Sequence, residues 1–261
     1  MSTLEPAVAP APIPGADVPD QFTVESAELR AEVSARTAIR FTPTGEPYIP
    51  FPAPLERFYL GAMRKSDIPH DVAMMNDIRV VRTVVGPPFP NPLINTQRWF
   101  VRERAFVVEL FAAYTEGKFL PATSSPFNVV RECLPDGSEE YVGQVTLGPM
   151  GPQKKRLTPV NDAWEDWRAT QVHSMGAVLR PEYHRKGIAS AAVRLVLNEW
   201  AVPQMGCTEI HAQCFVSNLG SYKLWEKYGF VEEPSMRKPV TISEAKGGGE
   251  ETDCLLVWSL K

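Results

Sequence analysis

The sequence contains little cysteine and no long apolar run. Its four cysteines among 261 residues are too few for the disulfide framework of a small secreted domain. No apolar stretch reaches the roughly eighteen residues of a membrane-spanning helix. Residues 1–17 lack the basic start and apolar centre of a secretory signal peptide. These absences predict free thiols, a reducing location such as the cytoplasm or nucleus, and no membrane partner.

The net charge of the chain is also small. The formal net charge is −4 and the pI is about 5.7. A surface devoted to nucleic acid needs a basic excess, so we expect no nucleic-acid partner. Hydrophobic residues make up 44% of the chain, which is enough for a packed core in one large domain or two small ones.

Metal-binding patterns are absent, although Cys207, His211 and Cys214 lie close together in the sequence. Their spacing matches no usual zinc pattern, and no second cysteine pair completes a site. In an extended strand, Cys207 and His211 share one face while Cys214 points to the other. We therefore expect no metal ion. A Gly-Lys-Ser/Thr pattern is missing too, which argues against a nucleotide-dependent kinase.

Composition divides the chain into three parts. Residues 1–25 are rich in Ala and Pro and predict a disordered tail. Residues 26–56 include a second proline-rich stretch and predict an extended arm laid on the domain. Residues 57–261 are expected to form a single domain with a long loop at 148–170, and loops of that length are often functional.

Apolar periodicity within the domain predicts alternating strands and helices. Strands are expected at 57–63, 106–114, 141–147, 176–179 and 208–216, with a late hairpin formed by 240–242 and 254–260. Helices are expected at 66–81, 96–105, 188–201 and 219–228. The pattern indicates an α+β fold with α/β-like alternation around a mixed sheet.

A basic, glycine-containing turn joins the strand at 176–179 to the helix that begins at Ile188. Arg185 and Lys186 supply cationic side chains, and Gly187 allows the backbone to approach a ligand closely. A helix N-terminus presents free backbone N–H groups and the positive end of the helix dipole. The turn therefore predicts a phosphate-binding site.

A second motif follows about thirty residues later, where Asn218 opens a helix that ends at Gly229. Together the two motifs resemble the acetyl-CoA-binding half of the GNAT N-acetyltransferase superfamily. The family's turn is matched at Gly187 and Ala189, with His184 where Gln or Arg is usual. The family's helix is matched at Asn218, Ser221, Glu226, Lys227, Gly229 and Phe230.

The resemblance implies a fold and a cofactor site. The fold is a mixed central β-sheet of about six to seven strands, flanked by helices and splayed between the fourth and fifth strands. The pyrophosphate of acetyl-CoA would lie on the turn, and its pantetheine arm would pair with the strand before it. The implied cofactor contacts are Ala177, Val178, Leu179, His184, Arg185, Lys186, Gly187, Ile188, Ala189, Ser190, Asn218 and Ser221.

The proton donor departs from the family pattern. Many members have a Tyr as general acid where this chain has Trp225, whose indole cannot donate a proton near neutral pH. The subgroup that acts on ribosomal-protein N-termini also lacks that Tyr, and its Arg-Pro-Glu-Tyr pattern is matched at 180–183. This subgroup is the nearest resemblance. Ser221 is then the leading donor to the thiolate, with Tyr222 and Tyr228 as alternatives.

The general base and the acceptor site are less constrained. That subgroup often has a Glu where this chain has Ser174, so His211, which titrates near neutral pH, is a candidate base, as is a water chain. His184 more simply serves the turn. In the long loop, carboxylates flanked by indoles suit a cationic amine, although the indoles could equally anchor the loop to the core. These acceptor-site candidates are Trp164, Glu165, Asp166 and Trp167.

The sequence therefore predicts an acetyl-CoA-dependent N-acetyltransferase, a monomer or homodimer that needs no metal. Its acceptor would be a primary amine on a protein N-terminus, a lysine or a small molecule. A non-catalytic acyl-CoA-binding module is the alternative, because neither the usual Tyr nor the strand Glu is present.

Overall fold

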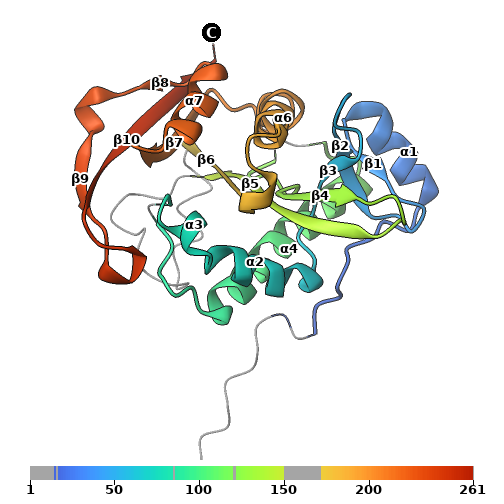
Figure 1. The fold of residues 1–261 in the computed structure, drawn as a ribbon. Helices are drawn as coiled ribbons and strands as arrows, with labels where there is room; N and C mark the ends of the chain where they lie inside the picture. Colours follow the sequence, from blue (N-terminus) through green and yellow to red (C-terminus); the bar gives the residue numbers. More distant parts are fainter. Residues whose placement is uncertain (1–14, 16, 85, 120–121, 150–171, 261) are drawn as a thin grey trace, which may run out of the picture.

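The computed structural model describes residue 15 and residues 17–84, 86–119, 122–149 and 172–260. Its centre is a ten-stranded sheet in the order β1-β2-β3-β4-β5-β6-β7-β10-β8, with β9 paired to β10 beside this path (Figure 1). The strands are β1 (Arg40–Phe41), β2 (Pro47–Pro50), β3 (Phe58–Gly61), β4 (Val129–Cys133), β5 (Glu139–Pro149), β6 (Val172–Leu179), β7 (Glu209–Phe215), β8 (Val231–Glu232), β9 (Lys238–Thr241) and β10 (Glu250–Ser259).

Helices cover both faces of this sheet. The α-helices are α1 (Ala27–Arg36), α2 (Ile68–Met75), α3 (Ile78–Val81), α4 (Leu93–Thr115), α6 (Ile188–Leu195) and α7 (Leu219–Lys227). A π-helical turn, Val196–Ala201, continues α6, and short 3₁₀ turns occupy Lys65–Asp67, Pro181–Tyr183, Pro234–Met236 and Glu244–Lys246. Helices α6 and α7 lie on one face and α2 and α4 on the other (Figure 1). Over the described residues, none of the helices is both long and apolar enough to cross a bilayer.

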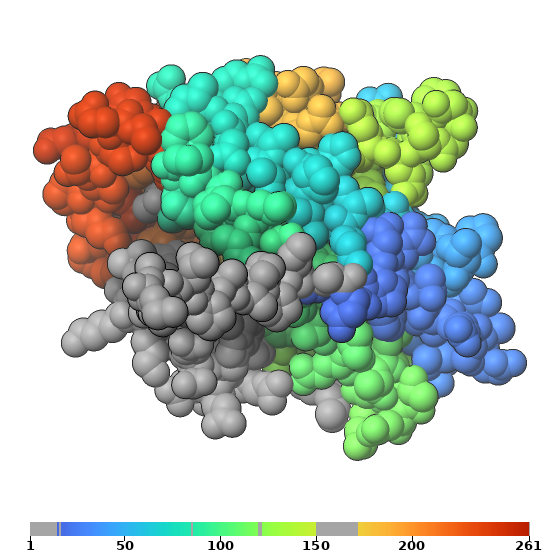
Figure 2. All heavy atoms as spheres, turned by 90° about the horizontal axis from the view of Figure 1, so that it is seen from below, coloured from blue at the N-terminus to red at the C-terminus, as the bar shows by residue number. Residues whose placement is uncertain are grey.

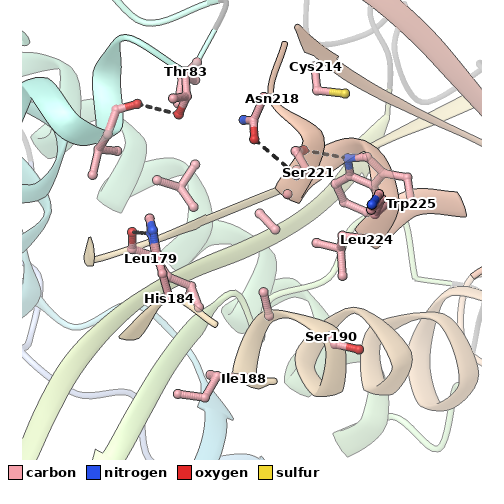
Figure 3. Close-up of a pocket in the computed structure, with 18 of the residues that line it drawn as sticks. Thr83, Leu179, His184, Ile188, Ser190, Cys214, Asn218, Ser221, Leu224 and Trp225 are labelled. Atoms are coloured by element: carbon pink, nitrogen blue, oxygen red, sulfur yellow. Dashed lines mark hydrogen bonds between the residues drawn. The ribbon is translucent and has the colours of Figure 1, made fainter. Parts of the chain in front are cut away.

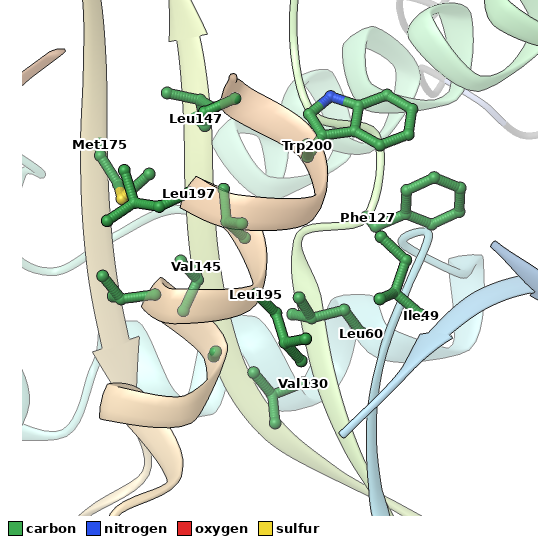
Figure 4. Packing of buried hydrophobic residues seen from close by; sticks show 14 of the residues in the cluster. Ile49, Leu60, Phe127, Val130, Val145, Leu147, Met175, Leu195, Leu197 and Trp200 are labelled. Carbon is green, nitrogen blue, oxygen red and sulfur yellow. The ribbon is translucent and has the colours of Figure 1, made fainter. Parts of the chain in front are cut away.

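The core follows from the alternation of side chains along the central strands. On β6, Met175 and Leu179 pack into the cluster beneath α6, while Val178 packs against the cluster beneath α2 and α4. Trp200, from the π-helical turn, is fully buried and donates its indole N–H to the Ser124 carbonyl at 3.0 Å. Figure 4 shows this turn and α6 packed over β5 and β6. Both faces of the central strands are therefore buried, which fixes their register.

Strands β6 and β7 diverge, as the resemblance to the GNAT family implies. They pair in parallel only at Val172–Glu209, His173–Ile210 and Ser174–His211. Beyond Ser174, β6 pairs with β5 up to Leu179, but its other edge has no strand partner among the described residues. The expected α+β fold with a mixed, splayed sheet is confirmed. The expected strand number of six to seven is too low, because β1, β2, β4 and β8 were not predicted.

The N-terminal region differs from the expected arm. Residues 26–56 contain α1, capped by Ser26, whose hydroxyl accepts from the Leu29 N–H, and strands β1 and β2, which extend the sheet. Ile49 of β2 is fully buried, so this segment belongs to the core rather than lying on it. The described part of the expected tail is also packed, since Val24 is buried and its N–H donates to the Gly45 carbonyl.

Two elements of the central chain were assigned wrongly from the sequence. Residues 106–114, expected as a strand, lie within the 23-residue helix α4. The buried residues Val107, Leu110, Phe111 and Tyr114 are spaced by three and four, which is the helical rather than the strand period. The helix expected at 66–81 is divided into α2 and α3, because the Asp77 side chain accepts from the backbone of α3 and starts a new helix.

Candidate functional site

A cleft of about 690 Å³ opens where β6 and β7 diverge (Figure 3). The splayed edge of β6 forms its floor, α7 one wall, and the turn before α6 one end. Residues of α3 and the segment after it form the opposite wall. Of the expected cofactor contacts, the lining includes Ala177, Val178, Leu179, His184, Arg185, Gly187, Ile188, Ala189, Ser190, Asn218 and Ser221; Lys186 does not line it.

The turn before α6 has the backbone shape of an anion site. Arg185 and Gly187 both have positive φ, 61° and 78°, and Gly187 is the N-cap of α6. A Cβ added at Gly187 would meet open space, so the conformation rather than crowding favours glycine there. The first N–H groups of α6 have no partner within the helix. They point, with the helix dipole, to the position where a phosphate would lie.

The His184 side chain ties this turn to β6. Its Nε2 lies 2.8 Å from the Leu179 carbonyl oxygen, so Nε2 carries the proton and donates. Lys186 instead turns away and lies over the Tyr183 ring, 5.3 Å from its centroid. The His184 bond therefore holds the turn before α6 against the end of β6. This gives His184 a structural role at the turn.

The charge of the cleft has one sign. Its described lining includes Arg79, Arg185, Lys223 and Lys227 but no Asp or Glu. Lys227 donates to the Ser190 hydroxyl at 2.7 Å and so lies beside the turn. A ligand with several negative charges is favoured by this arrangement.

At the other end of the cleft, α7 presents Asn218 and Ser221. The Asn218 Oδ1 accepts from the Ser221 N–H at 3.2 Å and caps the helix. The indole of Trp225, only 1% exposed, donates to Ser221 Oγ at 3.1 Å. Because the Ser221 oxygen is used as an acceptor, its own proton is directed elsewhere. Cys214 lies beside it, and burial raises the pKa of that thiol to about 12, so Cys214 stays neutral.

The other expected catalytic residues lie outside the cleft lining. Tyr228 donates its hydroxyl to the Ser190 carbonyl at 2.6 Å and packs behind the turn. His211 Nε2 lies 2.6 Å from a Glu209 oxygen, and Tyr222 donates to Glu232 at 2.8 Å. Tyr228 and His211 are therefore not among the residues that line the cleft. The acceptor-site candidates Trp164, Glu165, Asp166 and Trp167 lie outside the described residues.

The cysteine and histidine side chains considered for a metal are separated. Cys207 Sγ lies 3.4 Å from His173 Nδ1, and Cys214 Sγ lies 3.7 Å from the Sγ of Cys254 on the neighbouring strand. Over the part of the chain that the structure describes, no group of three His, Cys, Asp or Glu residues could hold a metal ion.

Several cleft residues were not predicted from the sequence. Lys223 and Lys227 lie four residues apart on α7, so helix periodicity would have placed them on one face. The α3 wall, which includes Arg79, Val80 and Thr83, carries no local signal. Its position depends on packing between segments a hundred residues apart, such as the ion pair of Arg79 with Glu182 at 3.1 Å.

Comparisons with known proteins agree with this geometry. Residues 57–231 match the sequence model of the family described as the acetyltransferase (GNAT) domain. No curated protein matches the chain in sequence.

Solved structures share the fold. An acetyltransferase of the GNAT family from Bacillus anthracis gives a TM-score of 0.50 at 17% identity, covering 81% of this chain and 98% of that one. The Salmonella typhimurium protein yncA, described as an acetyltransferase with its cofactor acetyl-CoA, gives 0.50 at 12% identity, covering 78% and 93%. The ribosomal-protein-S5-alanine acetyltransferase from Vibrio fischeri gives 0.49 at 17% identity, covering 78% and 93%.

At these identities the structural similarity concerns the fold alone. The family match spans well over half of the chain and includes the phosphate turn, the splayed strands and α7. The chain therefore belongs to the GNAT acetyltransferase family.

Proposed function

We propose that this protein is an N-acetyltransferase that moves the acetyl group of acetyl-CoA directly to a primary amine. One observation carries the proposal: beyond Ser174, an edge of β6 that pairs with no strand among the described residues runs through a cationic cleft and ends at the phosphate turn. The pantetheine arm of CoA contains two amides, which can pair with that edge along Ala177 and Val178 as an extra strand. The pyrophosphate then meets the first N–H groups of α6 and the side chain of Arg185.

The reaction needs no covalent enzyme intermediate. The neutral amine attacks the thioester carbonyl, a C–N bond forms, the C–S bond breaks, and the CoA thiolate leaves. The amine releases a proton and the thiolate takes one up. Ser221 is the proposed donor to the thiolate, since its hydroxyl lines the cleft and the Trp225 N–H donates to its oxygen, which leaves its own proton available. Positioning of the two reactants supplies much of the acceleration.

The cleft favours an amine that is already neutral near physiological pH. Its described lining has no carboxylate, and its one histidine, His184, is bonded to the Leu179 carbonyl. With no strong base among these described lining residues, the neutral fraction of the amine is expected to limit the rate. An α-amino group with a pKa near 8 is neutral about two hundred times more often at pH 7.5 than a lysine amine with a pKa near 10.4. An α-amine is therefore the favoured acceptor.

The pH dependence of the reaction should follow the pKa of the acceptor amine rather than that of an enzyme side chain. We expect kcat/KM for the acceptor to rise about tenfold per pH unit until it reaches the pKa of the amine itself. The measurement is thiol release between pH 6 and 9 with two acceptors of different pKa. A shared inflection that does not follow the amine would reveal an enzymic base and overturn this part of the proposal.

An amine panel tests the activity itself. The panel contains a lysine-free peptide with a free N-terminal alanine, Nα-acetyl-lysine amide, spermidine and phenylethylamine, each incubated with acetyl-CoA while thiol release is followed. We expect the peptide to be acetylated fastest. A rise in Tm with acetyl-CoA but no thiol release with any amine would instead support a non-catalytic acyl-CoA-binding module.

Asn218 should have a ligand role beyond capping α7. Asn218→Asp keeps a capping oxygen but replaces the amide donor with a negative charge. We expect it to retain the Tm of the wild type while weakening acetyl-CoA binding about tenfold, a lost polar contact plus repulsion. Isothermal titration of acetyl-CoA measures the effect. Ser26→Ala, which removes the cap of α1, is the control and should lower Tm without changing affinity. Wild-type affinity in Asn218→Asp would leave Asn218 as a cap only.

A further inference from the structure

The wall of the cleft opposite α7 belongs to a loop that hydrogen bonds hold at its base. Residues 77–90 leave α2 and return to α4, and the loop is closed at its base by two reciprocal bonds. The Asn91 N–H donates to Asn76 Oδ1 at 2.7 Å, and Asn76 Nδ2 donates to the Asn91 carbonyl at 2.9 Å. Thr83, Val84 and Gly86 of this loop line the cleft. The base alone does not fix these residues, because they lie at the far end of the loop.

Lys246 holds that far end from a distant part of the chain. Its Nζ donates to the Pro87 carbonyl at 2.6 Å and to the Val84 carbonyl at 3.3 Å. Charge-assisted bonds of this kind are about twice as strong as neutral ones. Figure 2 shows the red C-terminal hairpin lying against the turquoise segment that contains α3. Two segments about 160 residues apart are thus joined by one side chain.

The backbone of the hairpin tip that carries Lys246 is held by its own hydrogen bonds. The Ile242 N–H donates to the Gly249 carbonyl at 2.8 Å, and the Gly248 N–H donates to the Ser243 carbonyl at 3.0 Å. Three consecutive glycines, from Gly247 to Gly249, have positive φ, which only glycine adopts at low cost. Burial lowers the pKa of Lys246, consistent with an ammonium drawn out of water onto the two carbonyls.

The wall held by Lys246 bounds a particular end of the cleft. In Figure 3, Thr83 lies at the same end as Asn218 and Cys214, whereas His184 and Ile188 lie at the other end. This is the end away from the phosphate turn. If acetyl-CoA lies along β6 with its pyrophosphate on the turn, the thioester and the incoming amine meet here.

We propose that Lys246 is a positioning residue that fixes the acceptor side of the cleft, so that the incoming amine is held against the thioester. The inference rests on the proposed function. Lys246 touches neither reactant; it acts through Val84 and Pro87. Its loss should loosen acceptor binding while leaving the phosphate turn and β6 unchanged.

The test compares Lys246→Met, Lys246→Arg and Lys118→Met. Methionine keeps the length of the stem and removes the donors, arginine keeps charge and donors, and Lys118 is an exposed lysine paired with Glu116 far from the cleft. The measurements are amide exchange over residues 83–92, the affinity for acetyl-CoA, and KM and kcat for the panel amine with the highest kcat/KM.

For Lys246→Met we expect faster exchange, a KM about tenfold higher, and acetyl-CoA affinity and kcat within twofold of the wild type. Lys246→Arg should restore most of the KM, and Lys118→Met should match the wild type. Unchanged exchange or KM, or an equal loss of acetyl-CoA affinity, would overturn the proposal. If the wild type acetylates none of the amines, the proposed function fails, and the exchange data alone decide whether Lys246 holds the wall.

Discussion

Replacing Gly187 with glutamate should abolish the rise in Tm that acetyl-CoA gives the wild-type protein. Gly187 has φ of 78° and caps α6 at the phosphate turn. A glutamate there is strained by the positive φ and brings a negative charge to the position that the pyrophosphate would occupy. For the wild type, a ligand at a hundred times its Kd stabilises the folded state by about 2.7 kcal/mol. The variant should lose nearly all of this.

The control for that experiment is Gly117→Glu. Gly117 also has positive φ, 69°, and open space around its Cβ position, but it lies just after α4, away from the cleft. The two variants therefore share the backbone cost and the added charge. Both should be less stable without ligand, and only Gly117→Glu should keep the full shift with acetyl-CoA. A Gly187→Glu protein with a normal shift would remove the turn from the cofactor site.

Ser221→Ala should lower kcat about tenfold to a hundredfold with acetyl-CoA affinity nearly unchanged. General acids typically contribute about 10²–10⁴-fold, but a thiolate leaves readily because thiol pKa values are near 8.5. The effect should therefore fall near or below the lower limit. The variant also leaves the buried Trp225 N–H without its acceptor, which should cost about 1–3 kcal/mol of stability.

Ser217→Ala is the matched control, because Ser217 precedes the same helix and donates to Glu251 on the exposed surface. Steady-state kinetics at saturating acetyl-CoA separate the two variants. A kcat equal to that of the wild type in Ser221→Ala would exclude Ser221 as the donor. Since Tyr222 and Tyr228 are bonded to Glu232 and to the Ser190 carbonyl, solvent would then be the remaining proton source.

Sequence motifs a few residues long predicted the part of the candidate site that is formed by residues close together in the chain. The phosphate turn and the cap of α7 depend on glycine, asparagine and helix periodicity over a few residues, so they could be read directly. The wall formed by α3 and the bonds from Lys246 to Val84 and Pro87 could not be predicted in this way, because they join segments that meet only in the folded chain. In the sequence Lys246 is simply a lysine beside three glycines, typical of an exposed loop.

The errors in the fold have two different causes. The strand expected at 106–114 came from an apolar-rich stretch whose buried positions follow a helical period. Proline-rich residues 41–54 suggested an arm, yet prolines are tolerated near a sheet edge, and β2 begins and ends with proline while burying Ile49. The first error was a misread local period, whereas for β2 burial against neighbouring strands decided the structure.

The order of strands in the sheet has a consequence for biosynthesis. From β1 to β7 each strand neighbours the one made just before it, so the sheet can grow strand by strand as the nascent chain leaves the ribosome. Strand β10 comes last, yet it pairs with β7, β8 and β9, and Lys246 lies four residues before its first residue. A nascent chain that has not reached residue 246 has both an open β7 edge and a wall without its lysine anchor. Such an edge is prone to pair with other chains. Formation of β10 thus closes the β7 edge and, with Lys246 beside it, completes the wall of the cleft.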